Sequence, residues 1–156
     1  MNRYWTHYWT QKTLEDHREQ SGEQLGHTAG NQFLNCGVSE GDFVYCVSAI
    51  EGSVVLIARV QVDDVVSQET AIEYFGESIW KAKDHVIAKA GTGSVLRLDR
   101  IVPMDYVRKL RFITKMGETR VTFQGDGIDQ QTLRRVRELT ETSARLLDKI
   151  IDRTDA

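Results

Sequence analysis

The fold of this chain is decided by the stretch Gly41-Asp42-Phe43-Val44-Tyr45-Cys46-Val47 and by the run Val54-Val55-Leu56-Ile57-Ala58-Arg59-Val60-Gln61-Val62 that follows it. Both runs are rich in β-branched and aromatic residues, and the connector between them carries Gly52. This pattern predicts a β-hairpin. The first run shows little alternation of polar and apolar residues, so we expect both strands to be covered on both faces, in a small barrel or a covered sheet.

Two further segments belong with this hairpin. Tyr4-Trp5-Thr6 is a strand-forming opening, and Ala29-Gly30-Asn31-Gln32-Phe33-Leu34 stands just before the hairpin. Over roughly the first two thirds of the chain, these segments resemble the PUA-like barrels and especially the EVE domain. The resemblance implies an α+β fold, with a mixed or antiparallel β-barrel over about residues 1–125 and flanking helices.

The same resemblance carries an expectation about function. EVE domains, and the related YTH and ASCH groups, are associated with binding nucleic acid that carries a modified base, or with chemistry on modified nucleosides. The resemblance therefore implies that DNA or RNA is the partner of this chain. Whether the protein also forms a homodimer stays open.

Length and composition are those of one ordinary domain spanning residues 1–156. No apolar run approaches the ~20 residues that a membrane-spanning helix needs, and the N-terminus lacks the features of a secretory leader. We therefore expect a cytoplasmic protein without membrane contact. Cys36 and Cys46 have no CxxC spacing, and we expect both to be buried thiols rather than a disulfide.

Charge is distributed unevenly along the chain. The first 78 residues hold four Lys or Arg and twelve Asp or Glu, whereas residues 79–156 hold sixteen and eleven. This asymmetry predicts an acidic side and a basic side, and the basic side suits phosphate contacts. Charges that simply decorate solvated helices explain the pattern equally well.

Local patterns predict the remaining elements. In the opening strand, period two places Trp5, His7 and Trp9 on one face. At the other end, Val136, Leu139, Ser143, Leu146, Leu147 and Ile150 recur at spacings of three and four, which predicts a long C-terminal helix from Asp129 to about Ile151. Between them we expect a helix over 68–75, an alternating strand over 94–103, and a strand pair over 110–113 and 120–123.

Common catalytic and metal-binding motifs are missing from the sequence. His7, His17, His27 and His85 are scattered without ligand spacing, and no Gly-rich phosphate loop or Gly-x-Ser-x-Gly elbow is present. We expect no metal and no cofactor. The sequence therefore favours a binding module over an enzyme.

Aromatic residues beside polar loops suit the recognition of a nucleobase. A base offers two π faces for stacking, worth ~1 to 3 kcal/mol per base, and an edge that needs fixed donors and acceptors. The resemblance implies that Trp5 or Trp9 forms one wall of the pocket and that the loop with His27, Thr28 and Asn31 contacts the base edge. Trp80 is the candidate second wall. The candidate phosphate contacts are Arg97, Arg100, Lys109, Arg111, Arg134 and Arg135.

Two other functions remain open at this point. An ASCH-like amidohydrolase or nuclease acting on modified nucleosides would need a base, a nucleophile and an acid, and Lys12, Thr13 and Glu15 are at hand. Alternatively, the chain is a protein-interaction subunit of a defence or toxin system, in which the arginine-rich face of the last helix docks an acidic partner.

Overall fold

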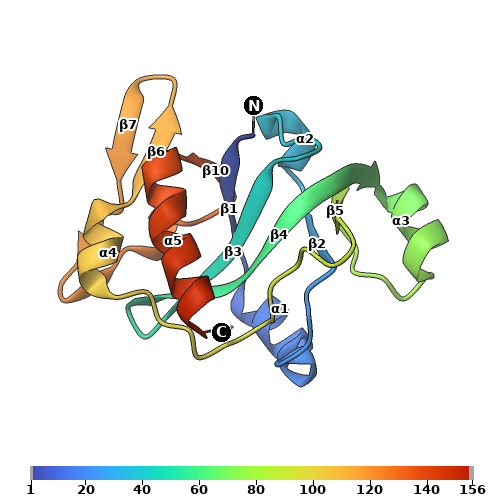
Figure 1. Ribbon diagram of the computed structural model, residues 1–156, viewed down its shortest axis with the longest axis horizontal. Coiled ribbons are helices and arrows are strands. Elements are labelled where there is room, and N and C mark those ends of the chain that lie inside the picture. The colour runs from blue at the N-terminus through green and yellow to red at the C-terminus, as the bar shows by residue number, and fades with distance from the viewer. Residues whose placement is uncertain (1, 155–156) are drawn as a thin grey trace.

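The computed structural model describes residues 2–154 and has the α+β architecture expected from the sequence (Figure 1). Its main feature is an eight-stranded sheet. In spatial order the strands are β2 (His27–Gly30), β5 (Asp84–Ala88), β4 (Ser53–Ser67), β3 (Phe43–Ile50), β1 (Tyr4–Tyr8), β10 (Val136–Leu139), β6 (Arg111–Thr114) and β7 (Gly117–Arg120). A separate small hairpin is formed by β8 (Phe123–Gln124) and β9 (Gly127–Ile128). The helices are α1 (Gln11–Asp16), α2 (Phe33–Cys36), α3 (Gln68–Phe75), α4 (Met104–Lys109) and α5 (Glu141–Thr154), with 3₁₀ turns η1 (Arg18–Gln20) and η2 (Gln130–Thr132).

The predicted central hairpin is confirmed as β3 and β4. Its turn is made by Glu51 and Gly52, which both have positive φ, at 51° and 79°. Two consecutive residues of this kind match the right-handed twist of the flanking strands. β4 is long enough to pair with β3 over its first part and with β5 over its last part, so it joins the two halves of the sheet.

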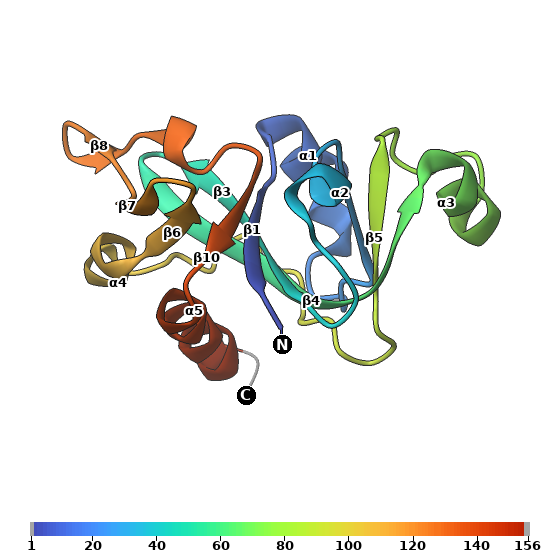
Figure 2. The same cartoon turned by 90° about the horizontal axis from the view of Figure 1, so that it is seen from above.

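Both faces of the sheet are covered, which explains why β3 lacks alternation. Val44 and Cys46 belong to one hydrophobic layer, and Tyr45 and Val47 belong to another on the opposite face. Helices α1 and α2 cover the first layer, and α5 covers the second (Figure 2). The expectation of strands buried on both sides is therefore confirmed.

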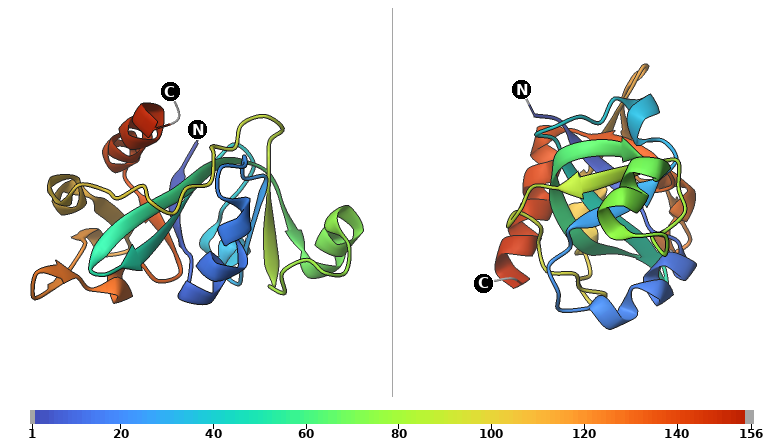
Figure 3. Two further views of the ribbon diagram at one scale, coloured as in Figure 1. Left: turned by 90° about the horizontal axis from the view of Figure 1, so that it is seen from below. Right: turned by 90° about the vertical axis from the view of Figure 1, so that its right-hand side faces the viewer.

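The opening strand β1 lies in the middle of the sheet. It pairs in parallel with β3, where Tyr4 lies opposite Phe43, and antiparallel with β10, where Tyr4 lies opposite Leu139. All other ladders of the sheet are antiparallel. Figure 3 shows the sheet strongly curved. Within residues 2–154 no ladder joins the two end strands, β2 and β7, so the sheet is open rather than a closed barrel.

Two element predictions are wrong. The segment over 94–103 is not a strand; it crosses the molecule as an extended connection with only the isolated bridges of Val95 and Ile101. The helix expected from Asp129 to Ile151 is replaced by η2, β10 and α5. Val136 and Leu139, which lie three apart, belong to opposite hydrophobic layers because β10 is covered on both faces.

Other element predictions are confirmed. Helix α3 has the predicted bounds, with the Ser67 hydroxyl as its N-cap and Gly76 at its end. The expected strand pair around Gly117 forms as the β6–β7 hairpin, although β7 ends at Arg120. None of the helices that the structure describes is both long and apolar enough to cross a membrane.

Candidate functional site

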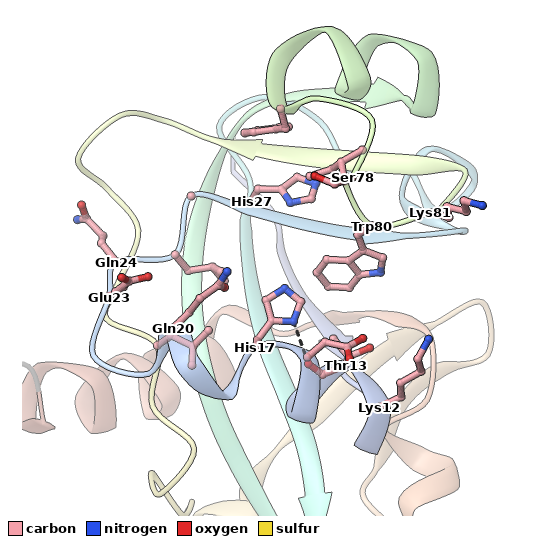
Figure 4. Close-up of a pocket in the computed structure, with 16 residues that line it drawn as sticks. Lys12, Thr13, His17, Gln20, Glu23, Gln24, His27, Ser78, Trp80 and Lys81 are labelled. Atoms are coloured by element: carbon pink, nitrogen blue, oxygen red, sulfur yellow. Dashed lines mark hydrogen bonds between the residues drawn. The ribbon is translucent and has the colours of Figure 1, made fainter.

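A cavity of about 870 Å³ opens between α1, the start of β2 and the segment that follows α3 (Figure 4). This volume falls in the range of sites that take small organic ligands. The residues that line it are Lys12, Thr13, Asp16, His17, Gln20, Glu23, Gln24, Leu25, Gly26, His27, Phe75, Ser78, Ile79, Trp80, Lys81 and Leu96. Segments far apart in the sequence therefore build one site.

Helix α1 places Thr13 and His17 on the cavity side. The N-cap of the helix is Thr10, whose hydroxyl accepts a hydrogen bond from the Thr13 backbone N–H over 3.3 Å. Thr13 and His17 are four residues apart and so lie on the same face. The Nδ1 atom of His17 donates to the Thr13 carbonyl oxygen over 2.8 Å. This bond fixes the orientation of the imidazole ring at the wall.

Trp80 is the main aromatic surface of the cavity. Its ring centroid lies 4.8 Å from that of His17 and 5.8 Å from that of His27, the latter with the two ring planes nearly perpendicular. Behind it, the buried Trp9 ring makes an edge contact at 5.6 Å. The indole of Trp80 is held by these rings but is only half-buried, so part of it remains open to the cavity.

His27 is tied to the interior by a chain of side chains. Its Nε2 atom lies 2.7 Å from Nδ1 of His85, and Nε2 of His85 lies 2.5 Å from Oε1 of Gln68. The same Gln68 oxygen accepts the backbone N–H of Ala82 over 3.0 Å. Burial, together with the neighbouring His85 and His17, lowers the pKa of His27 to about 4. His27 is therefore a neutral imidazole at physiological pH.

Charge around the cavity is mixed. Lys12 and Lys81 supply two ammonium groups, and Asp16 and Glu23 supply two carboxylates. An arrangement of this kind orients a polar ligand without favouring a single sign of charge. Within residues 2–154 no group of three or more His, Cys, Asp or Glu side chains is placed to hold a metal ion.

Trp5 and Trp9 do not form a wall of the cavity, contrary to expectation. Trp5 is 2% exposed and Trp9 is 0% exposed, and neither lines the cavity. The reason is that each buried indole N–H has a partner: Trp5 Nε1 donates to Asp42 and Trp9 Nε1 donates to Thr28. Thr28 is itself fully buried, so it is not available to a base edge.

Asn31 and Arg100 are also occupied elsewhere. Asn31 is exposed, and its Oδ1 accepts the backbone N–H of Lys83 over 2.9 Å; it does not line the cavity. Arg100 is only 2% exposed because its guanidinium donates to the carbonyl oxygens of Leu56 and Ile57. A phosphate role for Arg100 is therefore wrong.

The other predicted phosphate contacts lie away from the cavity. Arg97 lies beside a second hollow of about 620 Å³ on the other side of α1. Lys109, Arg111, Arg134 and Arg135 belong to α4, β6 and the loop before β10, at the end of the molecule opposite α3 (Figure 1). Since β10 replaces part of the predicted helix, Arg134, Arg135 and Arg137 do not form the arginine-rich helix face expected for a protein partner.

Of the six predicted base contacts, only His27 and Trp80 line the cavity. Sequence reasoning missed His17 and Phe75 altogether. The signal for His17 was present, because Thr13 and His17 have the i, i+4 spacing of one helix face. Phe75 is the last residue of the helix predicted over 68–75, and its ring packs on His27 with 4.8 Å between centroids.

Comparison with known proteins gives a likeness of fold only. No family model matches the sequence, and no curated protein matches it. Among solved structures, a hypothetical protein from Leishmania major is similar over 100% of this chain and 98% of its own, with a TM-score of 0.51 and 15% identity. A protein from Agrobacterium tumefaciens matches over 95% and 92% of the two chains, with a TM-score of 0.38 and 15% identity. The first of these supports a shared overall fold along the whole chain.

Proposed function

We propose that this protein binds nucleic acid that carries a modified base, and that one base enters the cavity beside Trp80. The observation that supports this is the partly exposed indole of Trp80 at the wall of the cavity, with the His17 and His27 rings beside it. Stacking on such a surface stabilises each bound base by ~1 to 3 kcal/mol. Trp80, the expected second wall, is thus proposed as the stacking surface, and Trp5 and Trp9 have no part in it.

The polar residues of the cavity suit the rest of a nucleotide. Gln20, Gln24 and Ser78 offer donors and acceptors for a base edge. Lys12 and Lys81 are the cations of the cavity, and we propose them as contacts for the adjacent phosphates. Lys109, Arg111, Arg134 and Arg135 remain proposed contacts for a longer nucleic acid that reaches the far end.

We also propose that the fold is a variant of the PUA-like barrel of the EVE type. The proposal is supported by the sequence resemblance of the β3–β4 hairpin, with the aromatic β1 beside it. The strong curvature of the open sheet is compatible with it (Figure 3). The α+β class itself does not depend on this assignment.

Fluorescence anisotropy of end-labelled oligonucleotides tests the binding of a base beside Trp80. Single-stranded DNA and RNA oligonucleotides, each with and without one modified cytosine or adenine, are added to the wild type, Trp80→Phe, Trp80→Ala and Tyr74→Ala. Tyr74 is the matched control, because its ring is 63% exposed on α3 and does not line the cavity. We expect Trp80→Ala to weaken binding about tenfold and Tyr74→Ala to leave it unchanged. Equal affinity of Trp80→Ala and the wild type would overturn the proposal.

A second candidate, an amidohydrolase for acylated nucleosides, is favoured by a specific observation. Lys12, Thr13 and Asp16 line the same cavity, and the Thr13 hydroxyl lies 3.1 Å from that of Thr10. In this reading the Thr13 oxygen attacks the acyl carbon, and Lys12, acting in its neutral amine form, takes the hydroxyl proton and passes it to the nucleoside amine as that amine leaves. Water then hydrolyses the acyl ester. Turnover of N4-acetylcytidine by the wild type, lost in Lys12→Ala, supports this candidate; no turnover by the wild type excludes it.

A further inference from the structure

The hydrogen-bond chain behind His27 fixes which of its ring nitrogens carries the proton. The backbone N–H of Ala82 is always a donor, so the Gln68 atom that it meets is the carbonyl oxygen. That oxygen can only accept, and His85 must therefore donate to it from Nε2. A neutral His85 then has a bare Nδ1, which accepts from Nε2 of His27. The Nδ1 atom of His27 is left as a lone-pair acceptor.

The lone pair on Nδ1 of His27 requires both the His27 and the His85 ring to be neutral. Burial lowers the pKa of His27 to about 4 and also lowers the pKa of His85. His85 is 0% exposed, so its ring can form hydrogen bonds only with other groups of the protein. His27 is partly exposed and lines the cavity, so its remaining nitrogen is available to a ligand.

A single hydrogen bond decides which nitrogen of the neutral His17 ring carries the proton. Its Nδ1 donates to the Thr13 carbonyl oxygen, which is a pure acceptor. In the neutral ring, Nε2 is therefore bare. Figure 4 shows the His17 and His27 rings on facing sides of the cavity, with Trp80 beside them and a nitrogen of each ring turned toward the space between them.

We infer that His27 is a specificity-determining residue that selects a base edge with an exocyclic amino group, and that His85 and Gln68 are positioning residues that hold it as an acceptor. In its neutral form, His17 adds a second imidazole lone pair to the cavity. An exocyclic amino group has two N–H bonds on one atom and can satisfy both. A carbonyl oxygen at the same place would direct its lone pairs at those of the imidazole nitrogens, and the two groups would repel each other. This inference rests on the proposed function and narrows it to bases that bear an amino group.

The hydrogen-bond chain from Gln68 through His85 to His27 is tested without a ligand. Long-range ¹H–¹⁵N spectra of histidine-labelled protein at pH 7.5 report which nitrogen of each ring is protonated. We expect the Nε2–H form for both His27 and His85 in the wild type and in the conservative variant Gln68→Glu, whose carboxylate still accepts. In Gln68→Leu the acceptor is gone, and we expect a mixture of forms at His85 and His27. An Nδ1–H form of His27 in the wild type would overturn the inference.

Selectivity is tested with oligonucleotides that differ in one amino group. One pair carries 5-methylcytosine or thymine at the central position, and the other carries adenine or hypoxanthine. We expect the amino-bearing member of each pair to bind the wild type about tenfold more tightly, because a bare imidazole nitrogen faces a carbonyl in the other. In Gln68→Leu we expect the ratio of the affinities for the two members of each pair to fall to about threefold or less.

The outcomes separate this inference from the proposed function. Equal affinity for both members of each pair, with binding still dependent on Trp80, overturns the selectivity of His27 and leaves the proposed function intact. Absence of any Trp80-dependent binding overturns both. A preference that survives unchanged in Gln68→Leu overturns the role of Gln68 as a positioning residue.

Discussion

The indole Nε1 of Trp5 donates a hydrogen bond to Oδ2 of Asp42 over 2.9 Å inside the core. The same carboxylate accepts the backbone N–H of Ser39 over 3.0 Å, and its Oδ1 accepts the backbone N–H of Arg3 over 3.0 Å. Asp42 thus joins the start of β1 to the turn that precedes β3. These bonds also explain why an aromatic residue with a polar N–H can be buried at the centre of the sheet.

Replacing Asp42 with alanine should therefore destabilise the fold. Asp42→Ala leaves the Trp5 indole N–H and two backbone N–H groups without their acceptor, at a cost of about 3 kcal/mol. Urea unfolding followed by circular dichroism measures this. The exposed Asp63→Ala is the control, with an expected change within about 0.5 kcal/mol. A loss of less than about 1 kcal/mol in Asp42→Ala would show that the carboxylate is not essential to this junction.

Asp148 connects helix α5 to the sheet by hydrogen bonds. Removal of the Tyr45 hydroxyl should therefore lower the stability of the protein. Oδ1 of Asp148 accepts from the Tyr45 hydroxyl and from Nη1 of Arg59, both over 2.7 Å. We expect Tyr45→Phe to lower the free energy of unfolding by about 1 kcal/mol. Arg145→Ala is the comparison, because its ion pair with Asp148 is longer, at 3.4 Å, and its side chain is 60% exposed. Equal losses of unfolding free energy in Tyr45→Phe and Arg145→Ala would contradict the conclusion that Asp148 is held mainly by its short contacts to the sheet.

The sequence predicts the hairpin and α3 well because their signals are local. A Gly-bearing turn between two β-branched runs, or a Ser cap followed by a Gly stop, depends on neighbouring residues alone. The C-terminal region fails for a physical reason. Val136 and Leu139 lie three residues apart, which matches a helix face, but in a strand covered on both sides they point into two different hydrophobic layers.

The sequence predicted only part of the candidate site. His27 and Trp80 were expected and do line the cavity. Trp5 and Trp9 were misplaced because their partners, Asp42 and Thr28, are distant in sequence and only the tertiary fold brings them together. No local pattern predicts such a pairing.

The burial of two of the three tryptophans leads to a direct test of the cavity. Only Trp80 is partly exposed, so acrylamide should quench the emission of Trp80 and leave that of Trp5 and Trp9 largely unchanged. We expect Trp80→Phe to remove most of the quenchable fraction of the emission. Strong quenching that persists in Trp80→Phe would mean that the core around Trp5 or Trp9 opens readily.

Two histidines with lowered pKa values, His7 and His27, should make the fold sensitive to mild acid. Burial lowers the pKa of His7 to about 3, with a further contribution from His27, and the pKa of His27 is lowered to about 4. Below pH 6.5 the unfolded chain takes up a proton at each position while the folded chain does not. Stability should therefore fall as the pH drops from about 6.5 toward 4, by about 1.4 kcal/mol per pH unit for each histidine.

Urea unfolding at pH 6.0, 5.5 and 5.0, compared with pH 7.5 and 8.5, measures this dependence. His7→Asn removes one titrating ring while keeping a side chain that can bond Thr28, whose hydroxyl lies 3.0 Å from His7 Nδ1. Whatever its stability at pH 7.5, this variant should show a slope smaller than that of the wild type by about 1.4 kcal/mol per pH unit between pH 6 and 5. Between pH 7.5 and 8.5 both rings are neutral in both states, so the two proteins should show the same slope. An unchanged slope in His7→Asn at acid pH would mean that His7 takes up its proton in the folded protein as readily as in the unfolded chain.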